Sequence, residues 1–138
     1  MKTTWNRRGI AGLVLHGLIA AIMILAGSAK LLGLFPPEAV AKLGLSVPIG
    51  VIGAGEVATA ILLLVPRTSS LGLLLASSFW GGAICFHMAR GESYVVQSVL
   101  LLLIWVGAYL RVPGAFSSFS VATAAVQAPA ATADAVVS

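Results

Sequence analysis

Four long apolar stretches set the strongest limit on how this chain can fold. They lie at residues 10–32, 48–65, 71–89 and 94–112, with short polar connections between them. Each is close to the ~20 residues that a helix needs to cross ~30 Å of hydrocarbon. The runs are continuous and lack the alternation that is typical of a transmembrane strand. The pattern therefore predicts four membrane-spanning helices.

Composition supports the membrane class. Of the 138 residues, 59% are hydrophobic and 9% are charged, whereas a soluble domain carries about 25% charged residues. So few charges could not keep a surface of this size in solution. The net charge of +4 comes from basic residues spread over the connections. That distribution indicates topology signals rather than a nucleic-acid-binding patch.

The connections predict the architecture. Because they are short, consecutive helices should be antiparallel neighbours. We expect an all-α, integral membrane four-helix bundle over residues 1–113. A short surface helix is expected at 38–43 in the first connection. Residues 114–138 are of low complexity and are expected to be a disordered tail.

The first apolar stretch is either a cleaved signal peptide or a retained membrane span, and this choice affects the topology. The first apolar stretch follows a basic start and contains Ala26-Gly-Ser-Ala29, which resembles a signal-peptide cleavage site. The stretch is long enough to span, so we expect it to be retained. The basic residues then place both termini in the cytoplasm and the multi-pass chain in the cytoplasmic (inner) membrane. Five lie on one side and three on the other: Lys2, Arg7, Arg8, Arg67 and Arg111, against Lys30, Lys42 and Arg90.

Small residues within the stretches predict helix packing. Close approach of helices in lipid depends on such residues, and several recur at four-residue spacing: Gly50, Ala54 and Ala58, Ser77 and Gly81, and Ser78 and Gly82. The single cysteine, Cys85, cannot form an internal disulfide. We expect it to be a small buried hydrophobe.

Glu56 is the most unusual residue of the second stretch. A charge at the centre of a membrane helix costs roughly 2.5–3.5 kcal/mol on insertion scales. Lys30, near the end of the first stretch, has a long stem that can reach toward Glu56. We expect the two to pair. His16, Met23 and Lys30 are spaced by seven residues and so lie on one helix face, together with Gly12 and Gly27.

Three further polar residues are candidates for a ligand- or proton-binding site. His87 and Gln97 should lie near the outer surface, so that each of the four helices contributes one polar group to the outer half. His16 should lie ~12 Å deeper than Glu56 and could extend a proton path only through water. This outer cluster either fixes the helix register or forms a polar cavity for a proton or small head group.

The sequence contains no cofactor or metal motif. It has no phosphate-binding glycine loop, no paired histidines at ligand spacing and no catalytic triad arrangement. We therefore expect no metal site and no independent catalytic activity.

Several segments together resemble the DoxX-like family of small four-helix bacterial membrane proteins. They are Ala26-Gly-Ser-Ala-Lys30-Leu-Leu-Gly33, Gly53-Ala-Gly-Glu56, Pro66-Arg67 and Phe86-His87-Met-Ala-Arg90-Gly-Glu92. Within that family, a related branch is a membrane subunit linked to thiosulfate and quinone oxidation. Other members are tied to oxidative-stress complexes, and distant relatives act as assembly factors.

The polar residues and the resemblance together leave three candidate functions. The first is an accessory subunit that supports a redox or quinone-linked membrane partner, with quinone as the implied cofactor. The second is a non-enzymatic assembly or interaction protein. The third is a small proton-coupled transporter, which would need a homo-oligomer because four helices enclose little space.

Overall fold

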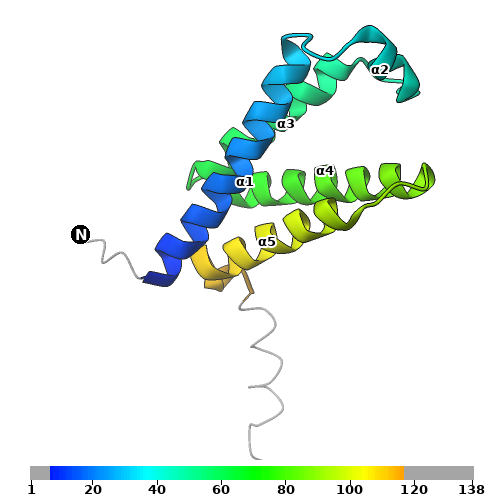
Figure 1. Ribbon diagram of the computed structural model, residues 1–138. Helices are drawn as coiled ribbons and strands as arrows, with labels where there is room; N and C mark the ends of the chain where they lie inside the picture. Colours follow the sequence, from blue (N-terminus) through cyan, green and yellow to red (C-terminus); the bar gives the residue numbers. More distant parts are fainter. Residues whose placement is uncertain (1–6, 117–138) are drawn as a thin grey trace, which may run out of the picture.

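The computed structural model describes residues 7–116, and these residues are almost entirely helical (Figure 1). No strand occurs between residues 7 and 116, so the all-α prediction is confirmed. Four long helices match the four apolar stretches to within three residues at each end. The elements are α1 (Arg7–Leu31), α2 (Pro37–Lys42), α3 (Ile49–Leu64), α4 (Ser69–Ala89), α5 (Val95–Arg111) and the 3-10 helix η1 (Pro113–Phe116).

Short connections join these helices. Gly33, Gly44 and Gly91 follow the ends of α1, α2 and α4, and each has a positive φ of 65°, 62° or 66°, a conformation that glycine adopts without steric cost. The surface helix expected at 38–43 is α2. Of the tail that is expected to be disordered, residues 117–138 lie outside the described residues. Residues 114–116 belong to η1. Lys2 also lies outside the described residues.

The long helices form two arms. Contacts link α1 with α3 and α5, and α4 with α3 and α5. Figure 1 shows α1 and α3 side by side in one arm and α4 and α5 in the other. The arms meet where α3 leads into α4, and they diverge toward α2 and the α4–α5 turn. This divergence leaves room between the arms at one end of the molecule.

Glycines bring the helices closest together at three crossings. A Cβ atom on Gly27 would lie 2.7 Å from the Gly53 carbonyl oxygen, and one on Gly12 would lie 2.6 Å from the Gly107 carbonyl oxygen. A Cβ atom on Gly72 would clash with the backbone of Leu63. The seven-residue face of α1 is therefore the packed face: Gly12, His16, Met23 and Gly27 are buried.

The small-residue packing predicted for α3 and α4 is wrong. Among the described atoms, nothing lies within 4 Å of a Cβ built on Gly50, Gly81 or Gly82, and Ala54 and Ala58 are exposed. The two serines instead bond within α4, from Ser77 Oγ to Leu73 O and from Ser78 Oγ to Leu74 O. Four-residue spacing identified a helix face correctly but not which face is buried.

Cys85 is exposed, which corrects the expectation of a buried thiol. The buried residues of α4 are Gly72, Ala76 and Trp80, spaced by four. Cys85 comes five residues after Trp80 and so lies about 140° around the helix from that line. The side chain therefore faces away from the helices that pack on α4.

Helix length and composition bear on membrane crossing. α1 and α4 are long and apolar enough to cross a membrane, and α3 and α5 are shorter apolar helices of 16 and 17 residues. Many large apolar side chains also face outward, among them Leu18, Leu25, Leu74, Val96, Leu102 and Trp105. An outer surface of this kind suits an apolar surrounding.

Candidate functional site

Lys30 and Glu56 form the ion pair that the sequence predicts. Lys30 Nζ lies 2.5 Å from Glu56 Oε2. The Glu56 side chain is 4% exposed and that of Lys30 is 18% exposed, so the pair is largely removed from solvent. Each member comes three residues after a crossing glycine, Gly27 or Gly53, which sets α1 and α3 close enough for the contact.

A cavity of about 590 Å³ lies beside this ion pair, between the two arms. Lys30, Glu56, His87 and Gln97 all line it, so the four residues predicted as an outer cluster share one space. Its walls are otherwise mainly apolar or aromatic, formed by residues that include Leu43, Leu45, Ile49, Ile52, Phe79 and Phe86. A volume of this size and an apolar wall with a few polar groups are typical of small-molecule sites.

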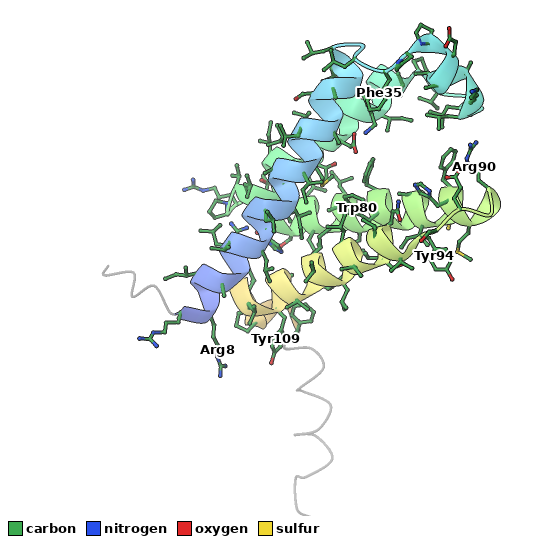
Figure 2. All side chains as sticks on the ribbon, viewed as in Figure 1. Arg8, Phe35, Trp80, Arg90, Tyr94 and Tyr109 are labelled. Carbon is green, nitrogen blue, oxygen red and sulfur yellow. The ribbon has the colours of Figure 1, made fainter. Side chains whose placement is uncertain are left out.

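Arg90 links the α4–α5 turn with α2. Arg90 Nη1 donates a hydrogen bond of 3.1 Å to the carbonyl oxygen of Lys42, the last residue of α2. In Figure 2, the Arg90 side chain points from the tip of this arm toward α2. Arg90 Nε also donates to Glu92 Oε1 at 2.7 Å, and its guanidinium lies 5.4 Å from the centre of the Phe86 ring.

Glu92 connects Arg90 with His87. His87 Nδ1 lies 2.9 Å from Glu92 Oε2, although the contact lacks hydrogen-bond geometry. The hydrogen bond from Arg90 is the main reason why the pKa of the Glu92 carboxyl lies below its ordinary value. The turn that carries His87 to the cavity is thus ordered by charges on its solvent side.

Three cavity-lining side chains carry a buried polar atom that makes no hydrogen bond to a described residue. One of these atoms, His87 Nδ1, lies 2.9 Å from Glu92 Oε2, whereas the other two have no such neighbour. Trp80 Nε1 and Gln97 Oε1 have no hydrogen-bond partner among the described residues, and both residues line the cavity. Trp80, labelled in Figure 2, lies at the middle of α4. An unsatisfied buried donor or acceptor costs about 1–3 kcal/mol. The cavity therefore offers one donor and one acceptor that the described chain leaves unused.

His16 lies apart from the other candidates. It is 2% exposed, and its Nε2 is 3.0 Å from the carbonyl oxygen of Ile104. Its Nδ1 is 3.4 Å from Arg111 Nη1. His16 does not line the cavity, and these contacts place it in the packing between α1 and α5. The hydrogen bond with Ile104 offsets part of the cost of burying the imidazole ring.

Sequence reasoning missed three residues at these sites. In the sequence Arg111 is only a topology signal, but in the structure it donates to the carbonyl oxygens of Leu63 and Leu64 at 2.8 and 2.9 Å. It therefore caps α3, whose last carbonyls have no partner within the helix. Arg90 is a topology signal and part of the family resemblance in the sequence, and Trp80 belongs to no motif. An aromatic residue in an apolar run carries no distinguishing signal, whereas a basic residue at a helix end does.

The arrangement has the features of a small-molecule binding site. Within residues 7–116, no group of three or more His, Cys, Asp or Glu side chains could hold a metal ion. The cavity instead combines apolar walls, a closed ion pair and unused hydrogen-bonding atoms. Fold and site together define an all-helical protein with a small-molecule-sized cavity between two helical arms.

Comparison with known proteins places the chain in a family. The chain belongs to the DoxX-like family, whose model matches residues 14–109, and it is a DoxX-like membrane protein. The match covers most of α1, all of α2, α3 and α4, and most of α5, so it includes every residue that lines the cavity. Searches of curated proteins and of solved structures returned no match.

Proposed function

We propose that this protein is an accessory subunit of a redox or quinone-linked membrane partner, and that its cavity holds a lipid-soluble small molecule. In this proposal the four long helices form a bundle in the bacterial inner membrane, with both termini in the cytoplasm. The observation that carries it is the meeting of Lys30, Glu56, His87 and Gln97 in one apolar-walled cavity. Quinone as the molecule follows from the family alone.

Physical cost supports a use for the cavity. Ionisable residues within membrane helices are expensive and are therefore associated with function. The half-open space of about 590 Å³ between the two arms leaves its apolar walls without the contacts that a closed core would make. An apolar ligand of matching size would recover those contacts, and polar atoms on the wall would orient it.

A second candidate function is that of a non-enzymatic assembly or interaction protein. The observation that favours it is the completeness of the Lys30–Glu56 pair, since each charge already has its partner. A buried pair of this kind can serve to fix helix register. A proton-coupled transporter is a third candidate and would need an oligomer, because four helices enclose little space. His16 is packed away from the cavity and so does not extend it.

Native mass spectrometry of the protein extracted with its own lipids tests the proposal. We expect a bound lipid-soluble molecule, a partner chain, or both. Glu56→Gln should abolish ligand retention while the helices stay folded, because it leaves Lys30 as an unpaired charge on the cavity wall. Glu38→Gln on α2 is the matched control that should leave retention unchanged. A well-folded Glu56→Gln variant that retains the same ligand would contradict a role for Glu56 in binding.

The proposed topology has its own test. A tag at either terminus should be inaccessible to an impermeant label applied to intact cells and should become accessible after lysis. Labelling of either tag in intact cells would overturn the proposed orientation without affecting the ligand proposal.

A further inference from the structure

We infer that the cavity takes an uncharged amphipathic molecule whose polar end both accepts a hydrogen bond from Trp80 and donates one to Gln97. This inference rests on the proposed function, because it specifies the chemistry of the ligand in the same cavity. It depends on three observations: the closed ion pair, the polar atoms of Trp80 and Gln97 that make no hydrogen bond to a described residue, and the apolar wall.

The ion pair sets the charge of the ligand. Lys30 and Glu56 lie 2.5 Å apart and neutralise each other. An anionic ligand that bound Lys30 would leave Glu56 as an unpaired buried carboxylate, and a cationic ligand that bound Glu56 would strand the ammonium group. Unpaired buried charges are strongly unfavourable. The ligand that leaves the pair intact is uncharged.

The unpartnered atoms set the polar end of the ligand. Trp80 Nε1 can only donate a hydrogen bond, whereas Gln97 Oε1 can only accept one. They come from α4 and α5, and both side chains border the same space. A hydroxyl or an amide group provides the acceptor and the donor that these two atoms need. Both atoms are almost fully covered, so the inferred hydrogen bonds require the Trp80 and Gln97 side chains to turn toward the ligand.

The walls set the body of the ligand. Aliphatic side chains from the α2–α3 connection and α3 face the cavity from one arm, namely Leu43, Leu45, Ile49 and Ile52. Aromatic side chains of α4, Phe79 and Phe86, face it from the other arm. An apolar body between these walls recovers the contacts that the open space forfeits.

Three probes with the same apolar body separate these requirements. They are 1-dodecanol, which has an uncharged donor and acceptor, dodecane, which has neither, and dodecanoate, which is charged. Affinity is measured on the full chain in detergent from the ligand-dependent rise in melting temperature. We expect dodecanol to bind about tenfold more tightly than either of the others, the effect of one or two net hydrogen bonds.

Trp80→Phe is the decisive variant, because it keeps the aromatic ring and removes the N–H. It should reduce the preference for dodecanol over dodecane by about three- to tenfold. Trp105→Phe is the matched control: Trp105 is exposed and does not line the cavity, so the preference should persist. If Trp80→Phe does not fold, Gln97→Leu tests the acceptor in the same way.

The outcomes separate this inference from the proposed function. Equal binding of the three probes, or an unchanged preference in Trp80→Phe and Gln97→Leu, would overturn the uncharged donor–acceptor ligand while leaving a cavity that binds lipid-soluble molecules. Absence of binding by every probe would also overturn it. A lipid-soluble molecule retained in the native mass spectrum would in that case still support the proposed function.

Discussion

Gly53 of α3 faces Gly27 of α1 so closely that a Cβ atom on Gly53 would lie 2.6 Å from the Gly27 carbonyl oxygen. The same Cβ would lie 2.8 Å from the Cβ of Lys30. Both distances are shorter than ordinary van der Waals contact. The helix crossing and the position of the Lys30 ammonium group therefore depend on the missing side chain at this position.

Gly53→Ala should separate α1 from α3 and weaken the protein. Over-packing of a close contact costs about 1–3 kcal/mol, and the free energy of unfolding in mild detergent should fall by that amount. Gly55→Ala is the matched control on the same helix, since nothing among the described atoms lies within 4 Å of its Cβ. It should be neutral or stabilising by up to about 1 kcal/mol. Equal effects of the two variants would contradict a glycine-dependent crossing.

The Lys30–Glu56 pair should behave as a coupled unit. Glu56→Leu and Lys30→Met each leave one charge without its partner, and removing one member of a buried pair costs about 3–5 kcal/mol. The double variant removes both charges and should recover much of that loss. The measurement is a double-mutant cycle of unfolding free energies. A double variant as unstable as the worse single variant would show that the two residues act independently.

The sequence was sufficient to predict the four long helices and the Lys30–Glu56 ion pair. Continuous apolar runs identify helices regardless of their partners, and a charge in such a run needs a counter-charge, so Glu56 pointed to Lys30. The buried face was harder to find, because α3 and α4 carry small residues on several faces. Gly50, Gly81 and Gly82 have the four-residue spacing of a packing face, but a Cβ atom built on any of them would meet no described atom within 4 Å. Gly53 and Gly72 instead lie at the helix crossings. The existence of the cavity, and the position of Trp80 on its wall, depend on how the two arms diverge. No local sequence pattern predicts that divergence.

Arg111 should stabilise the junction of three helices. From the end of α5 it donates to two carbonyl oxygens at the end of α3 and lies beside His16 of α1. Hydrogen bonds from charged groups contribute about 1.5–3 kcal/mol, so Arg111→Gln should lower the free energy of unfolding by about that amount.

Arg67→Gln provides the matched control for the junction. Arg67 is an exposed arginine in the α3–α4 connection, and its replacement should change the free energy of unfolding by less than about 0.5 kcal/mol. Hydrogen exchange adds a local readout, because loss of the Arg111 cap should speed exchange at the end of α3. If exchange there is the same in both variants, Arg111 does not act as the cap.

The contact between α2 and the α4–α5 turn should persist into acidic solution. Arg90 joins the two segments and is itself held by Glu92. Because the hydrogen bond from Arg90 lowers the pKa of Glu92 below its ordinary value of 4.5, the stabilisation by ionised Glu92 is fully present above that ordinary value. It is lost only as the pH falls through the lowered pKa.

Hydrogen exchange of α2 over a range of pH measures this dependence. The comparison is the ratio of exchange rates in Glu92→Gln and in the unaltered chain, since the intrinsic effect of pH cancels in a ratio. Above the ordinary pKa of Glu92, α2 should exchange faster in Glu92→Gln, because Arg90 has lost its charged partner. The ratio should approach one only as the pH falls through the lowered pKa of Glu92, where the carboxyl of the unaltered chain becomes protonated. Amides at the middle of α5 provide the internal control and should show a ratio of one throughout. A ratio of one for α2 at neutral pH would show that Glu92 does not hold Arg90 against Lys42.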